Sequence, residues 1–188
     1  MNVMLPVALE GLTDAVKVTV CCALDGLAED VSATVEATRT VCLRGFTTVR
    51  DLGPYRALVD VALRDAINRG DVVGPRMYVV GAYVTITGGA GAVTGFAPDV
   101  ALPWDLRFGN ANSPAEVRER IRALASQRVD AIKMFATGAV LTHNSNPQAR
   151  EATREELEAG VDEARNFGYR LAVHGSAAIR GNRPCRAT

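Results

Sequence analysis

Amphipathic helices and short apolar strands alternate along most of this sequence, from about residue 29 onward. The spacing predicts four helices and four strands: helices over 29–44, 54–69, from Ser113 and from Thr153, and strands over 46–50, 77–80, 129–140 and 169–174. Strands joined through helices pair in parallel with right-handed crossovers, so an α/β fold is expected. A doubly wound sheet and a (β/α) barrel both satisfy this rule, and polar residues at the strand ends favour the barrel.

Two of the predicted helices begin with a capping-box pattern. Ser113 is followed by Pro114 and then Glu116, and Thr153 is followed by Glu156. A hydroxyl at the cap and a carboxylate three residues later satisfy two free backbone N–H groups at a helix start. These two starts are therefore the most sharply predicted boundaries in the chain.

Composition excludes several classes of function. The 188 residues suffice for one domain, and 21 basic residues cancel 21 acidic ones, so nucleic acid and anionic membranes are not expected partners. The first twelve residues lack a basic segment, and no apolar run is long enough to span a bilayer, so a cytoplasmic protein is expected. The four cysteines have no zinc-binding spacing, which fits reduced thiols.

Lys133 is the first candidate for chemistry. It lies in the apolar strand 129–140, where alternation places it on one face with Ala131 and Phe135. A buried ammonium is costly, so such a lysine finds a partner, shifts its pKa or is modified. A catalytic amine, a phosphate anchor, a metal-bridging carbamate and a lysine that reaches solvent all remain open on this evidence.

Histidines and glycines supply further candidates. His174 ends a predicted strand on its small-residue face, which suits a metal ligand or a base as well as a core histidine. His143 lies in a polar loop, which fits a solvated histidine as well as a substrate contact, and Gly89 lies in the glycine-rich loop 87–95 on the substrate side. That loop lacks a phosphate-binding motif, so nucleotide binding ranks low. Arg50-Asp51 is interpreted as orienting a loop through an ion pair.

Several segments together resemble the metal-dependent amidohydrolase superfamily, and most closely its imidazolonepropionase-like and prolidase-like members. They keep the family's order and spacing over roughly residues 29 to 180. The matching segments are Gly45-Phe46-Thr47-Thr48-Val49-Arg50-Asp51-Leu52-Gly53, Gly74-Pro75-Arg76, Thr85-Ile86-Thr87-Gly88-Gly89, Ile132-Lys133, Ala136-Thr137-Gly138-Ala139-Val140-Leu141-Thr142, Glu155-Glu156-Leu157 and Ala172-Val173-His174.

The resemblance implies a (β/α)8 barrel with one or two divalent metals, usually zinc, at the mouth formed by the strand ends. Lys133 matches the family's fourth-strand lysine, which is often carboxylated and bridges the metals, and His174 matches the fifth-strand histidine. The metal lowers the pKa of bound water, so that hydroxide attacks an amide-like carbonyl at neutral pH. No other catalytic residue of the family matches a position of this chain.

Some positions depart from the family pattern. Val16 and Val18 stand where two metal-binding histidines belong, and Ala90 stands at a further histidine. Residues 181–188 match nothing expected, and the sixth-strand histidine and eighth-strand aspartate are absent. We therefore expect an incomplete barrel as one partial domain over 1–188, with a degenerate first strand in 1–28 and an aberrant tail in 181–188.

The expected function is a metal-dependent hydrolase acting on C–N bonds of a small amide, cyclic amide or dipeptide, impaired in this chain alone. The alternative is a non-catalytic half-barrel remnant that acts as a self-associating or interaction module, because an open barrel exposes a strand edge and an apolar wall. A nucleotide-binding α/β protein built on the loop 88–95 is the third hypothesis.

Overall fold

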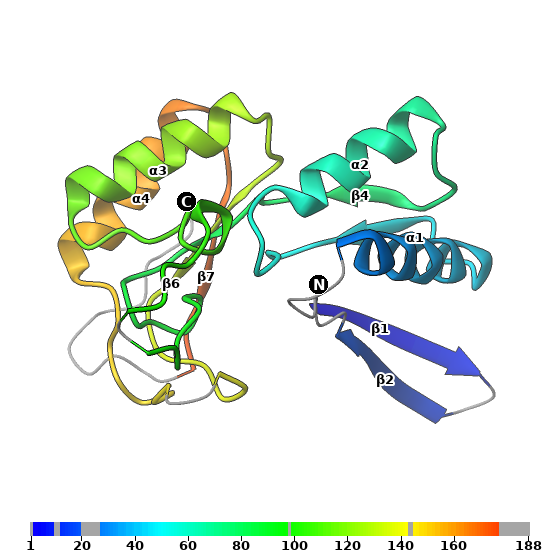
Figure 1. The fold of residues 1–188 in the computed structure, drawn as a ribbon, viewed down its shortest axis with the longest axis horizontal. Helices are drawn as coiled ribbons and strands as arrows, with labels where there is room; N and C mark the ends of the chain where they lie inside the picture. The colour runs from blue at the N-terminus through cyan, green and yellow to red at the C-terminus, as the bar shows by residue number, and fades with distance from the viewer. Residues whose placement is uncertain (1, 10–11, 20–26, 98, 143–144, 177–188) are drawn as a thin grey trace.

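The computed structural model describes residues 1–188 except 1, 10–11, 20–26, 98, 143–144 and 177–188. Its elements follow one another in the order β1 (Asn2–Leu9), β2 (Leu12–Thr19), α1 (Leu27–Leu43), β3 (Thr48–Arg50), α2 (Val59–Arg69), β4 (Arg76–Tyr78), β5 (Tyr83–Val84), the 3-10 turn η1 (Trp104–Leu106), α3 (Pro114–Ser126), β6 (Ile132–Phe135), α4 (Arg154–Asn166) and β7 (Leu171–His174). Figure 1 shows α3 and α4 packed together beside β6 and β7, with α2 beside β4.

The strands from β3 onward pair in parallel, as the alternating pattern predicts. β3 pairs with β4, and β5, β6 and β7 form a second ladder in which Lys133 lies between Tyr83 and Ala172. The two ladders are linked because the N–H groups of Asp130 and Ala131, just before β6, donate to the carbonyl of Val79, just after β4. The expectation of an α/β fold with parallel strands is confirmed.

A bend between β4 and β5 is held by the buried carboxylate of Asp60 in α2. Its Oδ2 accepts the N–H groups of Val80, at 3.1 Å, and Gly81, at 2.9 Å. Gly81 has a φ of 76°, in the left-handed region that glycine adopts without a steric penalty. The sequence predicts one strand over 77–80 followed by a long loop, so this bend and the short strand β5 were missed.

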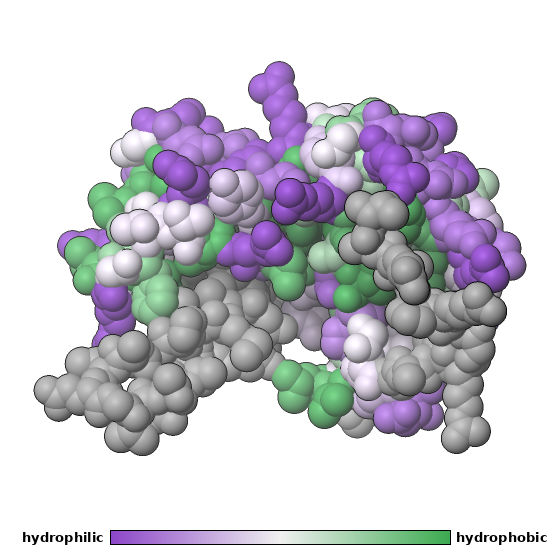
Figure 2. Space-filling model, turned by 180° about the vertical axis from the view of Figure 1, so that it is seen from behind, coloured by the Kyte–Doolittle hydropathy of each residue, from purple (hydrophilic) through white to green (hydrophobic). Residues whose placement is uncertain are grey.

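The core lies between the strands and the helices α2, α3 and α4. Ile121 and Leu124 of α3 have no exposed surface, and they pack in one cluster with Ile132 and Met134 of β6. Gly160 of α4 approaches Met134 so closely that an added Cβ would collide with its sulfur. Figure 2 shows hydrophilic side chains over the upper part of the molecule, where these helices lie.

Helix boundaries follow the capping chemistry only in part. Thr153 and Glu156 make both bonds of a capping box at the start of α4. At α3, Ser113 accepts the N–H of Glu116, but the Glu116 carboxylate accepts from Asn112 instead, so the second half of that box is wrong. The helix expected from residue 54 begins at Val59, after a left-handed residue.

The N-terminal strands form a hairpin of their own. β1 and β2 pair antiparallel, with Val16 opposite Leu5 and Val18 opposite Val3. The segment with these valines was expected to be a degenerate first strand of the barrel. In the described structure it pairs with β1, and this pairing is antiparallel, unlike that of the strands from β3 onward. No helix in the described ranges is long and apolar enough to cross a membrane.

Candidate functional site

Lys133 lies in a strand whose four residues are all buried. Only 8% of its surface is exposed, and burial lowers its pKa. Its Nζ lies 5.3 Å from the centre of the Phe135 ring, and within the described part of the chain no carboxylate forms an ion pair with it. An aromatic face compensates only part of the cost of a buried ammonium, so the charged form of Lys133 is destabilised here.

His174 ends β7 directly opposite Phe135 of β6. The two rings lie 5.1 Å apart, and the imidazole Nε2 is 2.9 Å from the hydroxyl of Ser176. Burial lowers the pKa of His174, the charge of Lys133 lowers it further, and a hydrogen bond to the Gly138 carbonyl opposes both effects. The imidazole is therefore mainly neutral at pH 7, as a metal ligand or a base must be.

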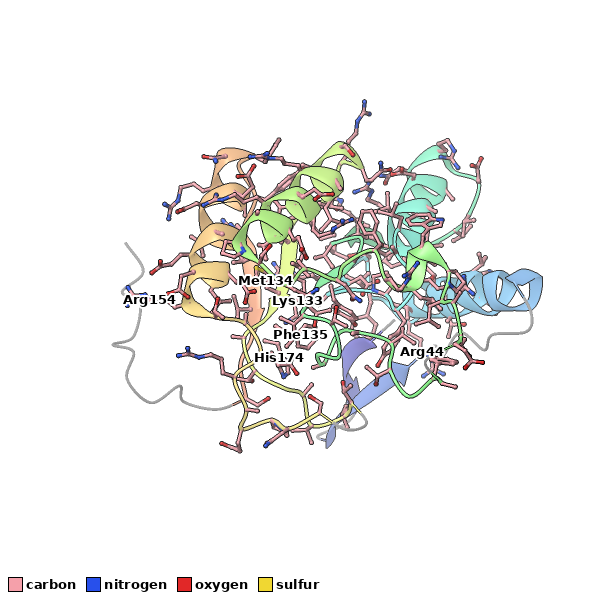
Figure 3. The ribbon with its side chains drawn as sticks, turned by 60° about the vertical axis from the view of Figure 1, so that its left-hand side comes forward. Arg44, Lys133, Met134, Phe135, Arg154 and His174 are labelled. Carbon is pink, nitrogen blue, oxygen red and sulfur yellow. The ribbon has the colours of Figure 1, made fainter. Side chains whose placement is uncertain are left out.

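Lys133 and His174 lie on the same side of the sheet. Both are in contact with the Phe135 ring, and the charge on Lys133 is close enough to affect the pKa of His174. Figure 3 shows the two residues and Phe135 grouped at the ends of β6 and β7, away from Arg44 and Arg154. The structure therefore brings together the two residues expected to hold a metal.

Two loops beyond the strand ends are tied together by Glu151. Both of its carboxylate oxygens lie 2.9 Å from the N–H of Ala90, and Oε1 lies 3.3 Å from the Ser145 hydroxyl. In addition, the Thr142 hydroxyl donates a hydrogen bond to the Ala90 carbonyl, at 3.0 Å. These bonds hold the glycine-rich loop against the segment that follows β6, beside the ends of the strands that carry Lys133 and His174.

Gly89 and His143 were both expected on the substrate side. Gly89 is buried, and a Cβ on it would lie 2.6 Å from the Thr85 hydroxyl and 2.8 Å from the Glu151 carboxylate. The absence of a side chain at this position thus lets Glu151 reach the loop, while a substrate contact by Gly89 stays a prediction. His143 lies outside the described residues, and its role also stays a prediction.

Arg50 and Asp51 do not form the expected ion pair. Asp51 is 1% exposed; its Oδ1 accepts the N–H of Gly53, and its Oδ2 has no hydrogen-bond partner in the described structure. Arg50 is exposed. The ion-pair interpretation is wrong, because a short aspartate turn orients this loop instead. Burial, followed by the charge of Asp60, raises the pKa of Asp51 to about 6.

Sequence reasoning placed Phe135 beside Lys133 but missed two further aromatic neighbours, Tyr83 and Tyr55. The Tyr83 ring lies 5.3 Å from the Phe135 ring and 6.2 Å from the Tyr55 ring, both edge to face. Burial raises the pKa of Tyr83, and the charge of Asp51 adds to this effect. Periodicity does not reveal that these three aromatic rings touch, because Tyr55, Tyr83 and Phe135 are far apart in the sequence.

The chemistry of the described residues fits part of a metal site. The His174 Nε2 already faces a hydroxyl partner, and an uncompensated buried Lys133 suits conversion to an anionic oxygen ligand. Within the described ranges, no three His, Cys, Asp or Glu side chains gather in a way that would hold a metal. In its described part, the chain therefore brings together two candidate ligands, fewer than a metal centre needs.

Comparison with known proteins identifies the family of this chain. Residues 27–182 match the model of the amidohydrolase family. An ochratoxinase from Aspergillus niger is 32% identical over 155 aligned positions, covering 72% of this chain and 30% of that protein. A Xaa-Pro dipeptidase structure with methionine bound in its active site superposes with a TM-score of 0.72 and 33% identity, over 82% of this chain and 38% of that one.

A phenylurea hydrolase B structure is also similar, with a TM-score of 0.61 and 26% identity over 81% of this chain and 38% of that one. The match to the family model covers most of the sequence, so this chain belongs to the amidohydrolase family. It spans about a third of the length of the relatives that it matches, 30% of the ochratoxinase and 38% of the dipeptidase.

Proposed function

We propose that this chain provides part of a metal-dependent hydrolase that cleaves C–N bonds in a small amide-like substrate. The observation that carries the proposal is the pair of Lys133 and His174 at neighbouring strand ends, with the lysine buried and without a carboxylate partner in the described structure. A dipeptidase and a phenylurea hydrolase among the similar proteins support the substrate class, since a dipeptide and a urea both carry nitrogen on a carbonyl carbon.

In this proposal Lys133 and His174 hold a divalent metal, with zinc as the expected ion. A bound metal supplies a water of lowered pKa and polarises the substrate carbonyl. Carboxylation of Lys133 removes the buried positive charge and supplies oxygen ligands, which burial in an apolar strand favours. The Gly138 carbonyl, through its hydrogen bond to the imidazole, helps to orient His174, and a metal would replace the Ser176 hydroxyl as the partner of Nε2.

The loops that Glu151 ties together form the substrate side of the site in this proposal. Gly89 lies in the first of these loops, which follow β5 and β6, and His143 is proposed as a substrate contact from its place in the sequence alone. We propose that β3, the bent strand formed by β4 and β5, β6 and β7 are the second to fifth strands of a (β/α)8 barrel, whose catalytic residues lie at this rim. A catalytic zinc needs three protein ligands, so two leave the centre weak in this chain alone.

A second candidate function is a non-catalytic module that self-associates. β7 has β6 as its partner, and within the described residues its other edge is unpaired, while 47% of Val173 is exposed. An open parallel edge is a template for pairing with another strand. The unpaired edge of β7 favours the self-associating module, whereas the buried Lys133 favours the hydrolase.

Metal analysis of the purified protein tests the proposal. We expect zinc bound at a stoichiometry that falls at least tenfold in Lys133→Ala and in His174→Ala, and stays unchanged in the control Arg44→Ala, whose residue is exposed and distant. Circular dichroism checks that each variant is folded. Equal metal content in all four proteins would refute the assigned ligands, and absence of metal together with concentration-dependent oligomers would favour the second candidate.

A further inference from the structure

A cavity of about 410 Å³ opens at the end of the fold opposite to the candidate metal centre. It lies between the last turn of α2, the start of β4 and the segment that leads into β6. Its lining is rich in arginine and consists of Arg64, Asp65, Asn68, Arg76, Met77, Tyr78, Arg128 and Asp130. A volume in this range suits a small-molecule ligand.

Both acidic residues of the lining are already engaged by Arg64, which is only 8% exposed. The Arg64 guanidinium lies 2.9 Å from Asp65 Oδ1 and 3.1 Å from Asp130 Oδ2. It also donates to the Arg128 carbonyl at 2.7 Å, and Asp130 accepts the N–H of Val79 at 2.9 Å. This network fixes one wall of the cavity and leaves little acidic capacity for the other arginines.

Arg76 and Arg128 are the remaining positive groups of the lining. Both are exposed, and no ion pair or side-chain hydrogen bond holds either guanidinium among the residues that the structure describes. The lining therefore has three guanidiniums against two carboxylates, a net charge of +1. Arginine binds phosphate and carboxylate oxygens through paired N–H groups, so two such side chains around one cavity suit an oxyanion.

The backbone at Arg128 is unusual for the end of a helix. Arg128 follows α3 with a φ of 55°, while the corresponding positions after α2 and α4 are Gly70, at 80°, and Gly168, at 73°. A non-glycine residue in this region costs of the order of 1 kcal/mol. The chain thus keeps an arginine beside the cavity at a position where its other helices use glycine.

We propose that this cavity binds an oxyanion, the phosphate group of a small molecule, between Arg76 and Arg128. Arg64, held by Asp65 and Asp130, supports the wall. The proposal does not depend on the hydrolase, because the cavity lies at the starts of β4 and β6 and the metal centre at the ends of β6 and β7.

Calorimetric titration with inorganic phosphate at constant ionic strength tests the proposal. The proteins compared are the unmodified chain, the double variant Arg76→Gln/Arg128→Gln, and the control Arg107→Gln, which removes an exposed arginine outside the cavity. We expect saturable binding in the unmodified chain and the control, and a dissociation constant at least tenfold higher in the double variant. Glutamine keeps the first three carbons of the arginine side chain and removes the charge, and the backbone carbonyl of residue 128 that Arg64 uses remains in place.

Each other outcome overturns the proposal. Equal phosphate affinity in all three proteins, or no saturable binding in any of them, would show that the arginines are only a solvated surface. Loss of phosphate binding in Lys133→Ala but not in the double variant would place the anion at the metal centre instead. Urea unfolding of the double variant shows that a lost signal does not come from a lost fold.

Discussion

The buried carboxylate of Asp51 makes the stability of this protein depend on pH in a direction opposite to that of a salt-bridged aspartate. Asp51 is 1% exposed, and its backbone donors are the N–H of Gly53, at 3.1 Å, and that of Leu52. Asp60 nearby has three backbone donors for its two oxygens. Charge is therefore better accommodated on Asp60, and Asp51 is the group that keeps its proton to higher pH.

The magnitude follows from the pKa of Asp51. Burial and the charge of Asp60 raise that pKa from 3.8 to about 6. A difference of this size corresponds to about 3 kcal/mol, since each tenfold change in proton affinity is worth about 1.36 kcal/mol. The folded state binds the proton more tightly than the unfolded chain. The contribution of Asp51 to the free energy of unfolding is therefore largest below pH 4, and about 3 kcal/mol of it is lost as the pH rises through 6.

Asp51→Asn removes the contribution of Asp51 to this dependence, because the amide cannot ionise. Burial also raises the pKa of Asp60, and that contribution remains in the variant. The asparagine oxygen still accepts from Gly53, while its buried NH2 group lacks an acceptor, at a cost of about 1–3 kcal/mol that the protonated carboxyl partly shares. We expect the variant to match or fall slightly below the unmodified protein at pH 4.5, and to be more stable by about 1–3 kcal/mol at pH 8.

Urea unfolding between pH 4.5 and 8, followed by circular dichroism, measures the difference. Asp99→Asn is the matched control, because it changes an exposed carboxylate in the same way. The difference between Asp51→Asn and the unmodified protein should grow steadily from pH 4.5 to 7, while the control shows no such growth. A difference that stays constant over this range would mean that the proton of Asp51 is not bound more tightly in the folded state.

Two further substitutions test the local structure around the site. Gly89→Ala places a Cβ 2.8 Å from the Glu151 carboxylate, so we expect a loss of about 1–3 kcal/mol in urea unfolding, compared with little change in Gly175→Ala, where a Cβ has open space. Thr153→Ala removes the hydroxyl that accepts the N–H of Glu156, and should cost about 1 kcal/mol, restored in part by Thr153→Ser. Equal stability in either pair would refute the corresponding contact.

The parallel α/β order and the helix starts with caps were accessible from the sequence. Periodicity places Ile132 and Met134 on one face of β6 and Lys133 on the other, and this alternation is what the structure shows. The capping box at Thr153 is local chemistry, so four residues suffice to predict it. Features that depend on residues close together in the sequence, such as this cap and this alternation, are therefore predicted well.

The bend at Gly81 and the role of Glu151 were not accessible in the same way. Both depend on a carboxylate that satisfies backbone N–H groups far away in the chain: Asp60 for Val80 and Gly81, and Glu151 for Ala90. Separations of 20 and 61 residues leave no periodic signal. Such bonds are visible only once the helices and strands are packed.

The same reasoning explains why the ion pair of Arg50 and Asp51 was the wrong expectation. Adjacent opposite charges suggest a pair, but neighbouring residues of a strand end point in opposite directions, so their charged groups diverge. Asp51 therefore turns inward without a cation, while Arg50 remains exposed.

Lys133 is in the complementary situation, because it is a buried amine without a carboxylate partner in the described structure. The charged forms of Asp51 and Lys133 have opposite signs, yet no ion pair joins them in the described structure. The pKa of Asp51 is raised and that of Lys133 is lowered, and each shift favours the neutral form of its group. The free energy that each costs is the reason to look for chemistry at the lysine and for pH-dependent stability at the aspartate.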